Sequence, residues 1–546
     1  MKRIYKKLLL ACSVVLFGLS SCIDLDMEPE GGIFTEDQWD VLLEGSPERA
    51  AAAINGLYSG LTQYGSITSW AGSLQHYDFG YAAACMMFDA SGIDSPAEFS
   101  GYNWFRNNMN LLDRTPTAAP GYFLWNLFYT HLKTANDILV SIPENTENAA
   151  LKAFRGQALT SRAFDYLHLV QMYQFTYKGN ETKPAVPIVT DKTTAEEAGN
   201  NPRATVQAVY NLIMDDLNEA VQLLEGFSRA NKGIINQNVA YGLRARANLL
   251  MQNWSAAAAD ADKAMAGYTP YSIEDVSEPT FNDIGASSWI WGSIITENND
   301  VVQSGIINFP SHMSSFTGNG YSPGYAARYI NSLLWQQIPD TDVRKGWWTD
   351  EDDDSPLVDW SWFRTYQGNP YNIAEWLGWN LLEWGAPAAS AMKHLNVKFG
   401  AYQSIYDNPT NACDIPLMRA EEMHLIKAEG LAMGGDLAAG KTALENFVTT
   451  YRDPDFVSTA ADAASLQDEV WFQRRVELWG EGFSLFDILR LKKAVTRKGA
   501  NFPSNMAFDF KAEDPIYLWL IPRDELNMNE GIDESTNNPV IPVPTP

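Results

Sequence analysis

Apolar residues spaced like one face of a helix predict a helical hairpin in residues 467–494, near the end of the chain. Its first helix carries one apolar stripe, made by Phe472, Val476 and Trp479. Arg474 falls on another face, where it can meet Glu477 or Glu481 about one turn further on. The pattern is typical of a packed helix whose polar face is bridged by ion pairs.

A second helix of this hairpin is predicted after Gly480 and Gly482, which interrupt the helical spacing. Ser484 is expected to be its N-cap, because a serine side chain can accept a hydrogen bond from a backbone N–H of the first turn. Asp487 and Arg490 follow at the spacing of an ion pair. Packing and ion pairing account for this stretch without a catalytic role.

Helical periodicity also covers much of the chain outside two long segments. Further helices are expected in residues 46–60, 125–139, 149–173, 206–224, 238–251, 255–266, 417–433 and 437–451. Thr205 is expected to be the N-cap of one of them. The last four form two pairs in which alanine alternates with larger apolar residues, as in tetratricopeptide repeats. Residues 289–296 are predicted to form a short strand.

Two long segments, residues 61–120 and 268–416, are predicted to be irregular. The first is rich in Gly, Ser, Asn and aromatic residues and has no sustained helical spacing. Within the second, eight of the chain's 18 tryptophans lie between residues 335 and 384, which is more than a uniform core would place there. Long irregular segments of compact proteins usually carry function. Both segments are therefore candidate ligand-binding regions.

The charge of the chain narrows the class of ligand. Its 39 Lys and Arg residues against 67 Asp and Glu residues give a net charge of −28 over 546 residues. Nucleic acids and anionic lipid surfaces are bound chiefly through basic residues, so this balance argues against both as partners. Hydrophobic residues make up 46% and charged residues 19% of the chain, which indicates a folded protein rather than a disordered one.

The N-terminus has the pattern of a lipoprotein signal peptide, predicted over residues 1–21. Basic residues precede an apolar run from Leu8 to Leu19, which is too short to span a bilayer. Cys22 ends a Leu-Ser-Ser-Cys lipobox, so we expect cleavage before Cys22 and acylation of its thiol, with palmitate among the chains. An ordinary signal peptide with an unrelated cysteine is the alternative. Residues 22–45 begin with an acidic stretch and are expected to form an extended tether.

Three short motifs near the C-terminus resemble those of the SusD/RagB-like family, the outer-membrane nutrient-capture lipoproteins of Bacteroidetes. They are Arg-Arg-x-Glu-Leu at 474–478, Glu-Gly-Phe at 481–483 and Phe-Asp-x-x-Arg at 486–490. Trp-x-x-x-Tyr at 125–129 and Asp-x-Arg at 342–344 are similar to further motifs of that family.

This resemblance, which extends from Cys22 to Pro539, implies a fold and a role. The fold is expected to be mainly α: a scaffold of four tetratricopeptide-like helical pairs with long irregular loops and a few short strands, in a single domain of residues 22–546. The role is to bind an oligosaccharide at the cell surface and deliver it to a SusC-like TonB-dependent transporter, with no enzymatic step and no cofactor. A lipid anchor in the outer membrane, facing the cell exterior, is implied with it.

Aromatic and polar residues of the two irregular segments are the candidate ligand contacts. Sugars offer apolar C–H faces to aromatic rings and hydroxyls to polar side chains. The candidates are Tyr77, Asp78, Tyr102, Trp104, Asn107, Trp347, Trp348, Trp360 and Trp362. Residues 104–107 also resemble the Trp-x-x-Asn motif of starch-binding family members. Packing is the alternative interpretation for these tryptophans, and Trp360 and Trp362 could share one face of a buried strand as well as of a binding platform.

Other chemistries find weaker support in the sequence. The acidic run at 350–354 could bind calcium, but it lacks the glycine and the ligand spacing of an EF-hand loop and is better interpreted as a solvated loop. No metal ligand is assigned. Three alternatives to glycan capture stay open: capture of a peptide or other nutrient by the same mechanism, glycoside hydrolysis by a pair of acidic residues, and a purely structural partnership with the transporter.

Overall fold

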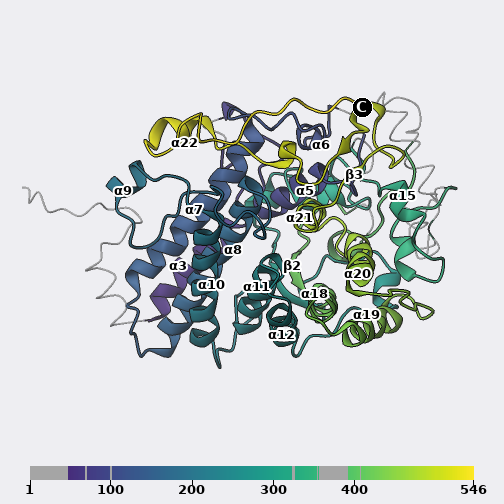
Figure 1. Cartoon of the computed structure of the whole chain (residues 1–546), viewed down its shortest axis with the longest axis horizontal. Coiled ribbons are helices and arrows are strands. Elements are labelled where there is room, and N and C mark those ends of the chain that lie inside the picture. The colour runs from purple at the N-terminus through teal and green to yellow at the C-terminus, as the bar shows by residue number, and fades with distance from the viewer. Residues whose placement is uncertain are drawn as a thin grey trace, which may run out of the picture. The chain divides into compact units, whose positions relative to one another are not determined.

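A row of long helices, each packed against the next, forms the framework of the protein (Figure 1). The row consists of α7 (Ala119–Ser141), α8 (Ala149–Tyr173), α10 (Val206–Leu223), α11 (Gln237–Leu250), α12 (Trp254–Ala264), α18 (Ala420–Met433), α19 (Leu437–Tyr451) and α20 (Ala463–Glu477). Contacts run in this order from α7 to α18, and α18 then packs against both α19 and α20. The mainly helical fold expected from the sequence is confirmed.

The computed structural model describes residues 47–67, 71–98, 101–322, 326–352, 355, 392–405 and 408–546. Residues 51–546 form one compact unit and residues 1–50 form another. Within residues 1–50 the structure describes only the start of helix α3 (Pro47–Gly60). The predicted signal peptide, Cys22 and the tether of residues 22–45 lie outside the described residues.

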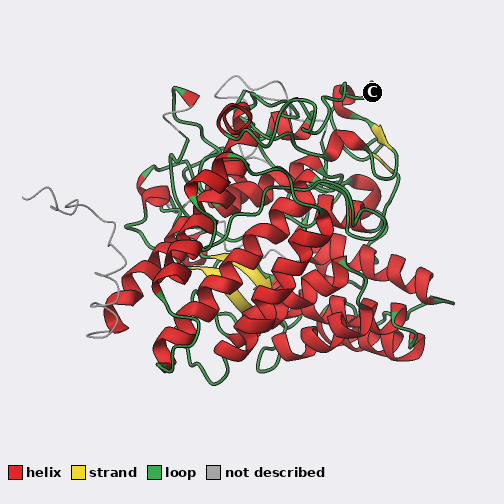
Figure 2. Cartoon of the chain, turned by 60° about the vertical axis from the view of Figure 1, so that its left-hand side comes forward, coloured by secondary structure: helices red, strands yellow, loops and turns green. Residues whose placement is uncertain are grey.

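Shorter elements connect and cover the helical row. The short helices are α5 (Tyr81–Ser91), α6 (Arg106–Met109), α9 (Ala195–Gly199), α13 (Asp300–Gln303), α14 (Phe309–Met313), α15 (Ser332–Trp335), α21 (Ser484–Arg490) and α22 (Arg523–Met528), with 3₁₀ turns at Asp275–Ser277, Val343–Trp347, Tyr402–Ser404, Ser504–Met506 and Pro515–Tyr517. Two small antiparallel sheets pair β1 (Trp289–Ser293) with β2 (Ile415–Arg419) and β3 (Val495–Thr496) with β4 (Asp509–Phe510). Figure 2 shows these strands as small yellow patches among red helices.

The two helix pairs predicted at 238–266 and 417–451 are present as α11–α12 and α18–α19. Glycine lets these helices approach closely. A Cβ on Gly430 of α18 would lie 2.6 Å from the carbonyl oxygen of Trp254 in α12. A Cβ on Gly440 of α19 would lie 2.7 Å from the Cβ of Ala432. Both distances are shorter than a carbon can tolerate, so helix contact here requires the absence of a side chain.

Helix α5 corrects the prediction that residues 61–120 are irregular throughout. Every residue of α5 is buried, including Asp89 near its end, and its apolar residues are spread over all sides of the helix. A helix without a polar face has no amphipathic period, which is why the spacing of apolar residues did not reveal it. Where the structure describes it, the rest of the segment up to the start of α7 consists mainly of turns and the four-residue helix α6.

The caps predicted for two helices had different outcomes. Thr205 caps α10 by accepting a hydrogen bond from the backbone N–H of Ala208, as expected. Ser484 is wrong as a cap, because it is the first residue of α21 and its hydroxyl donates to Asp94 at 2.9 Å. The cap is supplied instead by Asp89 of α5, whose carboxylate accepts from the backbone N–H groups of Gly482 and Ser484.

A buried carboxylate, Glu477 of α20, binds arginines from three other parts of the fold. Its oxygens lie 2.7 Å from Arg452, 3.1 Å from Arg419 and 3.2 Å from Arg344. Burial alone would raise the pKa of Glu477, but the three guanidinium groups outweigh it and hold this pKa well below its ordinary value. The prediction that Arg474 pairs with Glu477 is wrong, since Arg474 turns toward helix α21.

We predict that Gly430→Ala destabilises the protein by about 1–3 kcal/mol, the usual cost of overpacking a core. The added methyl group would force α12 and α18 apart. Gly199→Ala is the matched control, because no atom lies within 4 Å of a Cβ at that position. Chemical denaturation measures the free energy of unfolding of both variants. Equal free energies for the two would contradict the close contact of α12 and α18 at Gly430.

Candidate ligand-binding site

The two segments singled out in the sequence, 61–120 and 268–416, meet along residues 94–97 and 328–331. Ala97 pairs with Arg328 in an antiparallel bridge, and the backbone N–H of Tyr329 donates to Pro96 at 3.0 Å. The backbone N–H of Asn331 donates to the carbonyl oxygen of Asp94 at 3.2 Å. The junction therefore has fixed backbone pairing, although each segment is irregular by itself.

Four aromatic side chains gather beside this junction, and we call them the aromatic cluster: His76, Tyr102, Trp104 and Tyr321. The rings of His76 and Trp104 are stacked, with centroids 4.4 Å apart and planes 16° from parallel. The Tyr321 hydroxyl contacts Nδ1 of His76, and its ring centroid lies 6.1 Å from that of Tyr102. Tyr102 is 53% exposed and His76 and Trp104 are half-buried, so these three rings reach the surface, whereas Tyr321 is buried and supports them from within.

A buried layer beneath the cluster fixes the orientation of its rings. His312 stacks on Tyr321 with centroids 4.8 Å apart, and its Nε2 lies 2.9 Å from the carbonyl oxygen of His76. Phe105 meets His312 edge to face at 5.2 Å. Since the underlying rings are packed and hydrogen-bonded, the exposed ones are held in place before any ligand arrives, which reduces the entropy lost on binding.

Arg328 holds the turn that carries Tyr102 and Trp104. Its Nη2 donates to the side-chain oxygen of Asn103 at 3.2 Å, and its guanidinium lies over the ring of Phe105. The amide nitrogen of Asn103 in turn donates to the carbonyl oxygen of Glu98 at 3.0 Å. A cation from one irregular segment thus fixes the conformation of the other.

The histidines of this region are uncharged at neutral pH. Burial lowers the pKa of His76, and burial together with the nearby Arg328 lowers the pKa of His312 to about 3. The rings offered to a ligand are therefore neutral. A stacked, neutral aromatic surface suits the apolar C–H face of a sugar ring better than it suits an ion.

The structure places two of the predicted site residues in the aromatic cluster and a third on the short helix that follows Trp104 in the chain. Tyr102 and Trp104 belong to the aromatic cluster, and Asn107 is exposed on the adjacent helix α6. His76 and Tyr321 were not selected from the sequence. Tyr321 follows a Gly-Asn-Gly turn in the second segment, and only the fold shows that Tyr321 lies beside His76.

Four other predicted site residues lie in the interior, and we remove them from the candidate site. Trp347 is 2% exposed and Trp348 is fully buried, where its ring meets Trp479 edge to face. Tyr77 packs between buried phenylalanine rings. Asp78 accepts hydrogen bonds from the Ser66 hydroxyl and the Ile67 backbone, both at 2.8 Å. A ligand cannot reach these groups without disrupting the packing around them.

The remaining sequence candidates are only partly within the described residues. Trp360 and Trp362 lie outside them, as do the last two residues of the acidic run at 350–354. Among the residues that the structure describes, no group of three or more His, Cys, Asp or Glu side chains is placed to hold a metal ion. In that same part of the chain, none of the helices has the length and apolarity needed to cross a bilayer.

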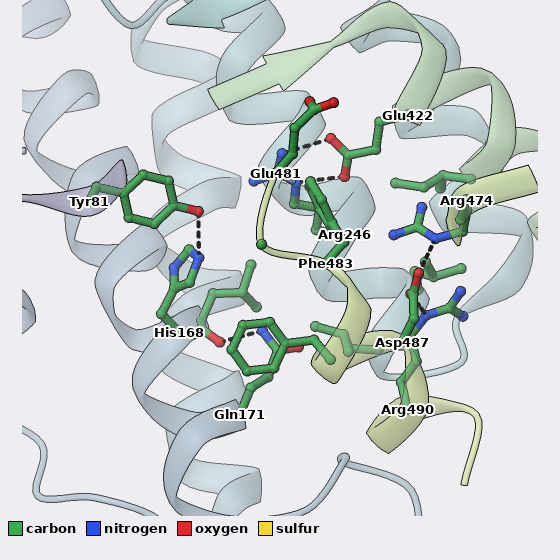
Figure 3. A pocket seen from close by; sticks show the side chains of 16 residues that line it. Tyr81, His168, Gln171, Arg246, Glu422, Arg474, Glu481, Phe483, Asp487 and Arg490 are labelled. Atoms are coloured by element: carbon green, nitrogen blue, oxygen red, sulfur yellow. Dashed lines mark hydrogen bonds and ion pairs between the residues drawn. The ribbon is translucent and has the colours of Figure 1, made fainter. Parts of the chain in front are cut away.

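Apart from the aromatic cluster, a small cavity of about 50 Å³ lies between helices α8, α11 and α18 and the hairpin formed by α20 and α21 (Figure 3). Its wall is rich in charge, but each carboxylate there is paired with a cation. Glu422 binds Arg246 at 2.7 Å, Glu481 binds Arg419 at 2.8 Å, and Asp487 binds both Arg474 and Arg490. The C-terminal motif residues are thus held in internal ion pairs.

The neutral side chains of this cavity are equally engaged. The Tyr81 hydroxyl lies 3.0 Å from Nε2 of His168, whose Nδ1 lies 2.8 Å from the carbonyl oxygen of Phe164. Burial lowers the pKa of His168 to about 3, so it is neutral and accepts from Tyr81. We conclude that this cavity belongs to the framework, and that the aromatic cluster is the better candidate for binding.

Two family profiles match the chain on either side of its middle. The first, described as starch-binding and associating with the outer membrane, matches residues 86–249, and the second, described as the SusD family, matches residues 385–544. Together they span more than half of the chain. A curated relative, SusD-like protein P38 of Formosa agariphila, is 22% identical over 405 residues, which cover 70% of this chain and 75% of the relative.

Solved structures share the fold over nearly the whole chain. A SusD-like carbohydrate-binding protein from Bacteroides vulgatus superposes with a TM-score of 0.70 at 24% identity, covering 91% of this chain and 98% of its own. A SusD superfamily protein from Bacteroides thetaiotaomicron gives a TM-score of 0.67 at 20% identity, covering 91% and 100%. A laminarin-binding SusD-like protein superposes with a TM-score of 0.61 at 20% identity, covering 90% of this chain and 99% of its own.

We predict that Asp487→Asn destabilises the protein by about 3–5 kcal/mol, because it leaves Arg474 buried without its carboxylate partner and removes one of the two carboxylates that bind Arg490, the other being Glu429. Burial would raise the pKa of Asp487, but these two arginines outweigh it and lower the pKa. At pH values above the pKa that Asp487 has in the unfolded chain, the ion pairs stabilise the fold fully. This stabilisation is lost as the pH falls through the lower pKa that Asp487 has in the folded protein.

Denaturation at neutral and acidic pH tests this expectation. The loss of stability relative to the wild type should be largest at neutral pH and should shrink in acid. Asp137→Asn is the control, because Asp137 forms an exposed pair with Lys133 and such pairs contribute little. A neutral-pH stability of Asp487→Asn equal to that of Asp137→Asn would show that the buried pairs do not matter.

Proposed function

We propose that this chain, which belongs to the SusD/RagB-like family, captures an oligosaccharide on the aromatic cluster, through the accessible rings of His76, Tyr102 and Trp104, with buried Tyr321 holding them in place. The observation that carries the proposal is the stacked pair of Trp104 and His76, supported from below by buried rings and open at Tyr102. A carbohydrate-binding relative and a laminarin-binding relative with the same fold support a sugar as the ligand class.

The chemistry of the surface fits an uncharged, extended sugar chain. Flat rings at different angles can contact successive sugar units through their C–H faces, because each ring offers a separate plane. Asn107, one turn beyond Trp104, supplies an amide group that can both donate to and accept from hydroxyls. Tyr102 adds a phenol at the exposed end, where a longer oligosaccharide would leave the cluster.

We propose binding without chemistry at this site. The four side chains of the cluster are aromatic, whereas most glycosidases need two carboxyl groups on opposite sides of the scissile bond. Asp78, the acidic neighbour of His76 in sequence, is buried and engaged with Ser66 and Ile67. The site can therefore hold a sugar in one orientation, but its own residues offer no acid–base pair.

The cellular setting is part of the same proposal. The lipobox at Cys22 would anchor the protein in the outer membrane, and the acidic residues after it would form a tether that exposes the protein to the cell exterior. The family expectation for the partner is a SusC-like TonB-dependent transporter. In this proposal the protein holds the oligosaccharide at the mouth of that transporter and delivers it for uptake.

Trp104→Ala is predicted to weaken oligosaccharide binding at least tenfold, or ~1.4 kcal/mol, because it removes the main ring of the stacked pair. The matched control is Trp335→Ala. Trp335 is a half-buried tryptophan stacked on His394 with centroids 4.0 Å apart and planes 16° from parallel, in a different part of the protein. Calorimetry measures the affinity of both variants for laminari-, malto- or cello-oligosaccharides, chosen from hits on a glycan array.

The outcome separates the ligand classes. Binding lost in Trp104→Ala and kept in Trp335→Ala supports the aromatic cluster as the site. Equal binding by the two variants would move the site elsewhere. If no glycan on the array binds while an extended peptide does so through Trp104, the cluster serves a peptide, and the oligosaccharide proposal is wrong.

Cys22→Ala is predicted to abolish membrane attachment in the native host, because it removes the thiol that would carry the acyl chains. Metabolic labelling with a palmitate analogue, followed by cell fractionation, measures acylation and location together. Ser21→Ala, which leaves the thiol in place, is the control. Labelled, membrane-bound Cys22→Ala protein would exclude Cys22 as the lipidation site.

A further inference from the structure

A separate cavity of about 240 Å³ opens between the C-terminal half of α3, the loop at 231–234 and the end of strand β1. Its polar lining comes from Asn55 and Ser59 of α3, Asn231 of the loop, Ser293 of β1 and Asn299 beyond it. Trp291, Tyr58 and Ile294 supply the apolar part of the wall. None of its lining residues belongs to the aromatic cluster or to the charged cavity of Figure 3.

The walls of this cavity are fixed by hydrogen bonds to the framework. The Tyr58 hydroxyl accepts from the backbone N–H of Ile235 at 3.1 Å and donates to Gln157. The indole N–H of Trp291 donates to the carbonyl oxygen of Gly233 at 3.2 Å. Arg229 donates to the carbonyl oxygens of Ile234 and Ile290 at 2.8 and 2.7 Å. The loop and the strand are therefore preorganised rather than loose.

The lining of this cavity carries no charged side chain. Although the chain has a net charge of −28, none of the described residues that line this cavity is Asp, Glu, Lys, Arg or His. An ionic ligand would find no counter-ion there, and a purely apolar ligand would leave amides and hydroxyls without partners. The lining thus selects for a neutral molecule with many hydroxyl groups.

The asparagines leave donors available to such a molecule. Asn231 uses its side-chain oxygen to accept from the backbone N–H of Gly233 at 2.9 Å, and Asn299 uses its oxygen to accept from Thr296 at 2.7 Å. Within the part of the chain that the structure describes, no protein group accepts a hydrogen bond from either amide nitrogen. Each side chain is oriented by its oxygen and keeps its two N–H donors for a ligand.

We propose that this cavity is a second binding site, which takes a single neutral sugar ring. Its volume is below the roughly 300–1,000 Å³ of pockets for drug-sized ligands, which suits one sugar ring rather than a long chain. Asn231 and Asn299 donate to ring hydroxyls, and Ile294, which is 38% exposed, covers an apolar face. The site would bind a chain terminus or a free monosaccharide independently of the aromatic cluster.

The test uses the chain from Cys22 onward in a Trp104→Ala background, so that the aromatic cluster does not contribute. The probes are the methyl glycosides of glucose, galactose and mannose, with glucuronate as the charged counterpart of glucose. Titration by saturation-transfer NMR is expected to show saturable binding of at least one neutral glycoside and at least fivefold weaker binding of glucuronate.

Asn231→Asp is the matched variant, because it keeps the oxygen that accepts from Gly233 and replaces only the N–H donors with a negative charge. It should weaken binding at least fivefold. If Asn231→Asp is unstable, Asn299→Asp takes its place, because it likewise keeps the oxygen that accepts from Thr296 and removes the N–H donors. Asn211→Asp, on the exposed face of α10, is the control and should bind unchanged. Circular dichroism confirms that each variant is folded.

Four results would overturn the second site, the first three of them measured in the Trp104→Ala background. These three are absence of saturable binding by all neutral glycosides, equal affinity for glucuronate, and unchanged affinity in folded Asn231→Asp. Binding that occurs in the wild type but disappears in the Trp104→Ala background belongs to the aromatic cluster and also overturns it. Because the background lacks Trp104, these results do not depend on whether the aromatic cluster captures oligosaccharides.

Discussion

The buried carboxylate of Glu477 is the constraint on which the structure most depends. Arg344, Arg419 and Arg452 reach it from a 3₁₀ turn in the irregular middle segment, from strand β2 and from the end of helix α19. A single one of these charges buried without its partner would cost several kcal/mol, so the chain cannot satisfy them one at a time. The three segments must be in their final places together. The residues that give the C-terminal motif its recognisable pattern are therefore structural, and the ion pairs they form explain why they need those charges.

This constraint extends to the aromatic cluster through Asp94. The hairpin that carries Glu477 also holds Asp94, since Arg475 pairs with its carboxylate at 2.6 Å and Trp479 donates to its carbonyl oxygen at 2.6 Å. Asp94 begins the stretch that pairs with residues 328–331 and leads to Tyr102 and Trp104. The helical framework thus places the first irregular segment, and backbone pairing at 94–97 joins the second segment to it. Arg328 of the second segment then holds the turn that carries Tyr102 and Trp104. Irregular backbone can form a defined surface here because its ends are fixed by buried polar contacts.

The sequence predicted the framework well and the site only in part, for physical reasons. Helices with one apolar face, such as α10, were found because burial on one side leaves a periodic pattern, whereas α5 was missed because it is buried on all sides. Tyr102, Trp104 and Asn107 were found because a tryptophan and an asparagine in a polar loop suit a sugar. Trp347 and Trp348 were chosen for the same composition and proved to be core residues, since composition does not say which face of a ring is covered. Tyr321 could not be found from the sequence, because its contact with His76 spans 245 residues.

The central claim is that the aromatic cluster holds a sugar chain on neutral rings fixed by the framework. A crystal structure of the protein with a bound oligosaccharide tests this claim most directly, because it shows which rings contact the ligand. The account predicts one sugar ring against Trp104 or Tyr102, a hydroxyl within hydrogen-bond distance of Asn107, and no change in the packing of His312 beneath. An oligosaccharide bound elsewhere on the protein, with the stacked pair of His76 and Trp104 bare, would contradict it.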